Sequence, residues 1–430
     1  MPVVDPLAVV RGIHFAATLL AAGTVIFIVL VAAPCLRPGE GSALLRRLTL
    51  MVWVALAGTV LTGLVWLVLV AANILDIPLA DAWLGFGPVA TDTRFGEIAG
   101  LRLGLAVTLG VLMTLPRQRA LQLAAAAGLS GLLAFTGHAG ATPGAAGWLH
   151  LTSDLLHLLA AAAWLGGLPG FALMLAAIGK STASAEGAFA RRATARFSAI
   201  GIASVGILLG SGLINSWELL GGPSNLWTTT YGRVLALKAA LFVFMVALAA
   251  VNRFRLTPRL PGPPAIRALR RNARIESALG LGVLMLVGVL GTVIPGAHVH
   301  TNAAAPPSEA AFVHIHTEIV MADVTIDPGH AGKSAATIRL WRDDSSDYHA
   351  RSVNLVLEPR DNTPRTLEQN VEQKIERTAE PRPDGTWHID ALDIPRAGVW
   401  ILRLTIRPES GAPVVLDAPI VITQCSNECW

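Results

Sequence analysis

Charged residues are scarce in this chain. They make up 14% of its 430 residues, against 53% hydrophobic residues, whereas soluble domains carry roughly 25% charged residues. The segment up to His300 is basic, with 21 Lys and Arg against 10 Asp and Glu, and the remainder is acidic, with 12 against 19. A basic, apolar first part and an acidic, polar second part indicate a membrane domain followed by a domain in water.

Several motifs are absent, and each absence excludes a class of function. The chain has no glycine-rich nucleotide-binding loop and no acid–base pair of a hydrolytic site, so we expect neither an ATP-driven pump nor a hydrolytic enzyme. The 7 methionines are scattered without a Met-x-x-Met pair, which gives no sign of a methionine-lined path for a soft metal ion. No nucleic-acid partner is expected.

Cysteine is rare too. Of the three cysteines, Cys35 stands alone, while Cys425 and Cys429 lie together near the end. In an oxidising compartment this pair favours a short disulfide loop, with metal ligation as the alternative. The first apolar run, from Leu7 to Ala33, lacks a basic start and a small-residue cleavage site, so we expect it to stay as a membrane span.

Long apolar runs are what the chain does contain. A membrane helix needs about 20 mostly apolar residues, and eight segments qualify: 8–33, 48–73, 98–115, 120–138, 149–178, 197–216, 232–252 and 275–295. Only Pro116 to Arg119 separates the third segment from the fourth, which predicts a tight helical hairpin there.

The charges of the loops predict the orientation. The loops after the second, fourth and sixth spans hold one basic residue, Arg94. Because basic loops stay in the cytoplasm, the sequence predicts a multi-pass protein of a bacterial inner membrane, with both termini and the C-terminal domain in the periplasm. The loops after the odd-numbered spans hold 16 basic residues: Arg37, Arg46, Arg47, Arg117, Arg119, Lys180, Arg191, Arg192, Arg196, Arg253, Arg255, Arg259, Arg267, Arg270, Arg271 and Arg274.

The spans also match as two sets of four. An even number of spans in each set gives both sets the same orientation, so we expect two parallel four-helix repeats with the first and fifth spans packed together. The matched positions are His14 and His157, Gly23 and Gly166, Thr62-Gly63-Leu64 and Ser211-Gly212-Leu213, and Arg102 and Lys238.

All 11 histidines fall on the predicted outer side. Ionisable groups within spans are costly and mark functional sites, and imidazole is a ligand for copper, zinc, iron and nickel. In the fifth span, His150, Asp154 and His157 share one helical face. The candidate metal ligands are His14, His138, His150, Asp154, His157, His298, His300, His314 and His316.

Two interpretations of these histidines stay open. Equivalence of the first and fifth spans predicts that His14 and His157 contribute to one metal site, with Asp154 orienting a ring or balancing charge. The alternative is that each histidine caps a helix end or is satisfied by a neighbouring hydroxyl or carbonyl. Four cations also fall at the outer ends of spans, where they are expected to pair with a buried carboxylate; the alternative is that they hold an anionic ligand or tune the metal site. The cations are Arg11, Arg102, Arg233 and Lys238, and the candidate carboxylates are Glu97, Asp154 and Glu218.

The chain after the spans has another character. We expect a membrane domain over residues 1–297, a linker over 298–310 and a periplasmic domain over 311–430. Period-2 runs separated by turn signals are typical of an immunoglobulin-like β-sandwich, and His314-Ile-His316 would place both imidazoles on one side of an extended strand. The runs cover Val320–Ile326, Ala336–Trp341, Val353–Leu357, Thr386–Leu392, Gly398–Ile406 and Val414–Ile422.

Several of these motifs occur together in one known family. From about residue 8 to 297 the chain resembles the CopD copper-resistance membrane family, and the tail looks like the YtkA-type β-domain fused to such proteins. The resemblance implies uptake or delivery of periplasmic copper, with a periplasmic copper chaperone as a candidate partner. It is carried by Gly137-His138-Ala139, the stretch from His157 to Leu168, Phe197-Ser198, Ser211 to Asn215, Tyr231-Gly232-Arg233 with Lys238, Asn252-Arg253, Arg274-Ile-Glu276, Met321 to Gly329 and Gly398-Val-Trp400.

Two other functions remain open from the sequence. Histidines on facing helices could clamp a b-type haem for electron transfer or metal reduction, which strong visible absorbance would reveal. An assembly factor would bind copper but fail to move it into vesicles. Apart from the haem-dependent reductase, no enzyme activity is expected.

The loop charges predict which positions are accessible from each side of the membrane. Single cysteines near Ala141 and Ser224 should react with an impermeant thiol reagent only from outside, and one near Ser184 only from inside. The reverse labelling pattern would contradict the orientation and the outer placement of the histidines.

The strand pattern predicts that residues 311–424 fold alone. This fragment should be soluble, give a β-type circular-dichroism spectrum and bind copper modestly, with binding lost when His314 and His316 become alanine. A helical spectrum would contradict the predicted sandwich.

Overall fold

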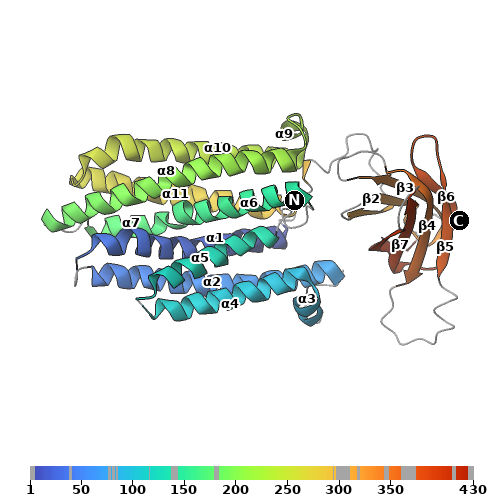
Figure 1. Cartoon of the computed structure of the whole chain (residues 1–430), viewed down its shortest axis with the longest axis horizontal. Helices are drawn as coiled ribbons and strands as arrows, with labels where there is room; N and C mark the ends of the chain where they lie inside the picture. Colours follow the sequence, from blue (N-terminus) through green and yellow to red (C-terminus); the bar gives the residue numbers. More distant parts are fainter. Residues whose placement is uncertain are drawn as a thin grey trace. The chain divides into compact units, whose positions relative to one another are not determined.

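The computed structural model describes residues 5–37, 41–75, 79, 83, 86–115, 117–136, 144–178, 184–293, 295–296, 310–316, 320–342, 348–359, 374–408 and 413–424. The chain divides into two compact units, Met1–Val299 and His300–Trp430. Figure 1 shows the first unit as a bundle of long helices and the second as a β-domain.

The first unit is helical. Its helices are α1 (Pro6–Ile26), α2 (Ser42–Leu75), α3 (Phe86–Asp92), α4 (Arg94–Met113), α5 (Arg119–Gly131), α6 (Gly144–Ala161), α7 (Leu168–Ile178), α8 (Ser184–Leu220), α9 (Asn225–Thr228), α10 (Thr230–Val251) and α11 (Pro263–Leu290). Wider π-helical turns extend α1 over Phe27–Ala32, join α6 to α7 over Ala162–Gly166, and follow α10 over Asn252–Leu256.

The predicted eight spans are confirmed among the described residues. Several helices begin well before their apolar runs, because the helix continues past the apolar stretch with basic residues on its surface. The helical segments long and apolar enough to cross a membrane are Pro6–Cys35, Ser42–Asn73, Arg94–Met113, Arg119–Thr136, Gly147–Ile178, Glu186–Leu220, Thr230–Arg259 and Pro263–Leu290.

Successive spans run in alternate directions (Figure 1). We call the end at which α1, α4, α6 and α10 begin the histidine end, and the opposite end the basic end. At the histidine end the Arg11 guanidinium donates to the Gly291 carbonyl at 3.1 Å. At the basic end Arg192 donates to the Cys35 carbonyl at 3.1 Å.

The first and fifth spans cross at two glycines. A Cβ atom on Gly23 would collide with the backbone of Ala162, and one on Gly166 with the backbone of Leu19. Small residues let membrane helices approach closely in this way. Since Gly23 follows His14 at the spacing by which Gly166 follows His157, the crossing joins equivalent positions of the two predicted repeats.

The helix contacts of the two halves correspond. In the first half α1 packs against α2 and α5, α2 against α4, and α4 against α5. In the second half the fifth span packs against α8 and α11, α8 against α10, and α10 against α11. Thr93 and Thr229 cap α4 and α10 alike, each accepting a hydrogen bond from a glycine N–H, at 3.0 and 2.9 Å. These are the contacts that two parallel four-helix repeats require.

The second unit has the predicted immunoglobulin-like order. Its antiparallel strands follow the order β1-β2-β3-β6-β5-β4-β7-β8, in which β2-β3-β6-β5 and β4-β7-β8 match the two sheets of that sandwich. The strands are β1 (Ala311–His316), β2 (Met321–Asp327), β3 (Gly332–Trp341), β4 (Ala350–Pro359), β5 (Ile375–Pro381), β6 (Trp387–Ile394), β7 (Gly398–Pro408) and β8 (Val414–Ile422).

Alternating side chains build the core of this domain. Trp400, Leu402 and Leu404 of β7 are buried, and the Trp400 indole donates to the Arg396 carbonyl at 3.2 Å. Strand β5 was missed by the sequence analysis because only Ile375 and Ala379 of it are buried, which leaves no apolar alternation to recognise.

Some sequence predictions for this region lie outside what the structure describes. His314 and His316 belong to β1, in keeping with an extended strand, but their side chains are not among the described ones. Cys425 and Cys429 are also outside the described residues, so their disulfide stays a prediction.

The glycine crossing predicts a position-specific loss of stability. Gly23→Ala should lower the thermal unfolding temperature of the detergent-purified protein, because the added methyl group pushes the first and fifth spans apart. Gly104→Ala in α4 is the matched control, since a Cβ there meets nothing within 4 Å. Equal unfolding temperatures for the two variants would contradict the crossing.

Candidate functional site

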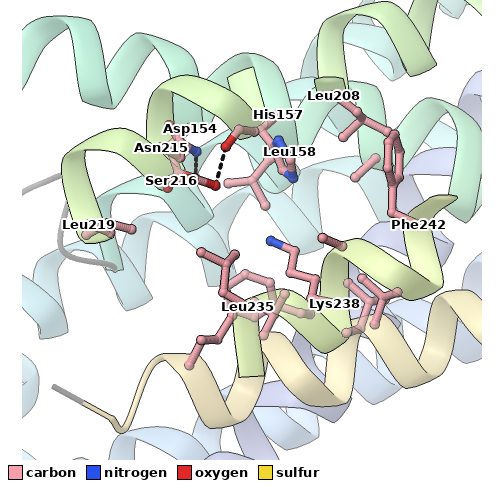
Figure 2. Close-up of a pocket in the computed structure, with 18 of the residues that line it drawn as sticks. Asp154, His157, Leu158, Leu208, Asn215, Ser216, Leu219, Leu235, Lys238 and Phe242 are labelled. Atoms are coloured by element: carbon pink, nitrogen blue, oxygen red, sulfur yellow. Dashed lines mark hydrogen bonds between the residues drawn. The ribbon is translucent and has the colours of Figure 1, made fainter. Parts of the chain in front are cut away.

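A cavity of about 300 Å³ lies in the second half of the bundle. Most of its wall is apolar, and side chains of α1, α6, α8, α10 and α11 line it. We call it the second-half cavity; Figure 2 shows part of its lining. Its polar lining residues are Arg11, His150, Asp154, His157, Asn215, Ser216, Tyr231 and Lys238.

The ring of His157 is oriented by Ser211. The Ser211 hydroxyl donates to the Ile207 carbonyl at 2.6 Å and lies 2.9 Å from His157 Nδ1. Because the hydroxyl proton is already used, the neutral ring donates through Nδ1–H to Ser211, and the lone pair is left on Nε2. A ring held by its other nitrogen in this way is the usual arrangement of a metal-binding histidine.

Among the described residues that line this cavity, Asp154 carries the acidic side chain. The Asn215 amide donates to its Oδ1 at 3.2 Å, and the positive charges of Arg11 and Lys238 act on the carboxylate. Figure 2 shows the Lys238 amine extending from α10 into the cavity, opposite Asp154 and His157. Of the pairings that the sequence allowed, these are the ones of Arg11 and Lys238 with Asp154.

His14 lies in a different cavity. This first-half cavity has a volume of about 180 Å³, and His14, Trp66 and Arg102 line it. His14 Nδ1 is 2.9 Å from the Thr62 hydroxyl, which donates to the Gly58 carbonyl at 2.6 Å. His14 therefore has the same tautomer as His157, and its Nε2 is buried without a partner among the described residues.

The two cavities differ in charge. At the position equivalent to Asp154 the first half carries Arg11, whose guanidinium lies 5.5 Å from the centre of the Trp66 ring. Arg102, the counterpart of Lys238, donates to the Thr18 hydroxyl at 3.2 Å. Among the described residues, no acidic side chain lines the first-half cavity, whereas the second-half cavity combines histidines with a carboxylate.

The predicted site residues are therefore divided. The structure brings His150, Asp154 and His157 to one cavity and His14 to another, so each half has its own histidine cavity in place of the single site expected. Within the described residues no group of three or more His, Cys, Asp and Glu could hold a metal ion together. His138, His298 and His300 lie outside the described residues.

The hydroxyl partners of the histidines were missed by the sequence analysis. The signal was present in the matched Thr62-Gly63 and Ser211-Gly212 motifs. A Cβ on Gly63 would lie 3.1 Å from His14 Cε1, and one on Gly212 would lie 3.6 Å from His157 Cε1. Each motif thus supplies a hydroxyl for one ring nitrogen and a glycine beside the ring; a Cβ would crowd the ring at Gly63 and would make an ordinary contact at Gly212.

Comparison with known proteins matches the helical unit in two segments. The family model for copper resistance protein D matches residues 191–290, and the model for the N-terminal domain of copper resistance protein D-like proteins matches residues 2–148. Copper resistance protein D of Pseudomonas syringae pv. tomato is 32% identical over 233 residues, which cover 50% of this chain and 75% of that protein. The chain belongs to the copper resistance protein D family.

Two further relatives show how far the similarity extends. Inner membrane protein YebZ of Escherichia coli is 36% identical over 210 residues, which cover 47% of this chain and 70% of that protein. Copper transport protein CutJ of Bacillus subtilis is 26% identical over 275 residues, which cover 63% of this chain but only 46% of that protein. No solved structure matches the chain. This copper resistance protein D family member is a multi-pass membrane protein with a copper-related function.

Proposed function

We propose that the protein takes up periplasmic copper through the second-half cavity. The observation that carries this proposal is the orientation of His157 by Ser211 at 2.9 Å, which leaves Nε2 free to bind a metal in a cavity that also holds His150 and Asp154. The name of CutJ, a copper transport protein of the same family, supports it.

The spacing of these residues suits a path better than a fixed metal cage. With a rise of 1.5 Å per residue, His150 and Asp154 lie roughly 6 Å apart along the helix axis and Asp154 and His157 roughly 4.5 Å. An ion that enters at the histidine end would contact them in succession. Ligands at successive depths along the helix account for the lack of a preformed three-ligand cluster among the described residues.

The positive charges in the cavity also suit transport of a copper ion better than its tight binding. Arg11 and Lys238 already place two positive charges near Asp154. An arriving copper ion adds positive charge where the dielectric constant is low, so the like charges weaken its binding. Weak binding at successive positions allows an ion to leave again, which transport requires.

The orientation of the path follows from the loop charges. The positive-inside rule puts the histidine end, both termini and the β-domain in the periplasm. We propose that His138, His298, His300, His314 and His316 collect copper on that side, and that a periplasmic copper chaperone delivers it. The second-half cavity would then receive the ion from the periplasm.

Copper uptake should depend on His157 more than on His14. In proteoliposomes, His157→Ala should reduce the uptake rate by at least about tenfold, because its metal-binding nitrogen is lost. His14→Ala is the matched control: it removes the equivalent ring from the cavity that lacks a carboxylate, and uptake should stay within about twofold of the parent.

Three outcomes would count against the proposed function. If His157→Ala takes up copper like the parent, the second-half cavity is not the path. If the parent binds copper but moves none into vesicles, the protein is an assembly factor. Strong visible absorbance of the purified parent would support the haem alternative, which no observation on the described residues favours.

A further inference from the structure

A second cavity in the same half lies toward the basic end. Its volume is about 210 Å³, and it is lined by the π-helical turn of the fifth span together with α7, α8, α10 and α11. We call it the basic-end cavity. Its polar lining residues are Thr194, Ser198, Asn252, Arg253, Thr257 and Glu276.

A chain of amide hydrogen bonds ends on Glu276. Asn272 Nδ2 donates to Asn252 Oδ1 at 2.7 Å, and Asn252 Nδ2 donates to Glu276 Oε1 at 2.6 Å. Asn272 and Glu276 lie one turn apart on α11, while Asn252 begins the π-helical turn after α10. Wide turns of this kind are frequent at functional sites, and here the turn places a neutral donor against the carboxyl group.

Glu276 is buried, and within the described residues its carboxylate forms no ion pair. Its exposed fraction is 1%. The fifth span and α7 present Trp164, Leu168 and Phe171 to the cavity, and α8 presents Thr194, Phe197 and Ser198. Arg253 is the other charged lining residue, and its side chain is exposed. A buried ionised carboxylate without a paired charge is costly, so such groups carry a proton or bind a cation.

The lining of the basic-end cavity favours a proton over copper. Its donors are oxygen and amide groups, whereas Cu(I) prefers sulfur ligands. The Thr194 hydroxyl is buried and has no hydrogen-bond partner among the described residues, so an uncharged polar group lines the same cavity as Glu276.

One apolar layer separates the two cavities of this half. Leu165, Phe242 and Met245 line the second-half cavity, while Trp164 and Val246, their neighbours in the chain, line the basic-end cavity. The Trp164 and Phe242 rings meet edge to face, with centres 6.2 Å apart. The cavities therefore follow one another along the same helices, from the histidine end toward the basic end.

We propose that Glu276 is a proton-binding carboxyl group at the inner end of the copper path, and that its proton exchange is coupled to copper movement. The proton leaves Glu276 toward the basic end as a copper ion passes the apolar layer, and the carboxylate formed offsets the charge of the ion. Reprotonation from the histidine end restores the neutral group, so that each cycle moves one proton toward the basic end. The coupling rests on the proposed copper uptake, whereas the protonation of Glu276 does not.

Infrared spectroscopy tests the protonation directly. The parent at neutral pH should show a protonated-carboxyl C=O band that disappears in Glu276→Gln and persists in Glu276→Asp. Glu97→Gln is the matched control, because Glu97 is an exposed acidic residue in the first turn of α4, and it should leave the band unchanged. Identical spectra for the parent and Glu276→Gln would overturn the proposal.

Proteoliposomes with a pH-sensitive dye inside test the coupling. Copper added outside should change the internal pH in the parent and in Glu97→Gln, and this change should be lost in Glu276→Gln. A parent that takes up copper with the same pH change as Glu276→Gln would overturn the coupling alone. A parent that moves no copper would overturn the proposed function and the coupling together, and the infrared result would still decide the protonation.

Discussion

The close crossing of the first and fifth spans at Gly23 and Gly166 is the contact on which the helical unit depends. Because neither residue has a side chain, the two central helices approach backbone to backbone, and the other six spans arrange around them with matching neighbours. The crossing lies deeper in the bundle than His14 and His157. The two rings therefore diverge above it into separate cavities, each completed by a hydroxyl from the next helix at 2.9 Å.

The residues that differ between the two halves then determine the chemistry of each cavity. The repeated framework keeps the histidine, its hydroxyl partner, the glycine beside the ring and a buried cation in both halves. One exchange of charge sign separates the halves: the second half carries Asp154 where the first half carries Arg11, and both of these side chains line the second-half cavity. Inside a membrane that difference is large, because water cannot screen it. Among the described residues, the second half has a carboxylate beside its histidines, and a second polar cavity, with Glu276, follows along the same helices.

Much of the fold could be predicted because membrane spans and sandwich strands have strong periodic signals. Apolar length identified the eight spans, and alternation identified most strands of the β-domain. The failures have physical causes. Strand β5 buries only Ile375 and Ala379. It is a strand because it pairs with neighbouring strands, and no local sequence pattern predicts that pairing. The short helices α3 and α9 were missed for the same reason, since neither is long or apolar enough to give a periodic signal.

Composition, period and spacing were enough to predict the class of the protein, the number of spans, the duplication and the shared helical face of His150, Asp154 and His157. Which side chains share a cavity was decided only by the tertiary structure. Equivalent residues of two repeats meet at one site only if they lie near the axis that relates the repeats. Here the two spans diverge from the glycine crossing, so His14 and His157 line separate cavities. The chain from Asn272 through Asn252 to Glu276 likewise joins α11 to the π-helical turn after α10, a contact that exists only once those helices pack.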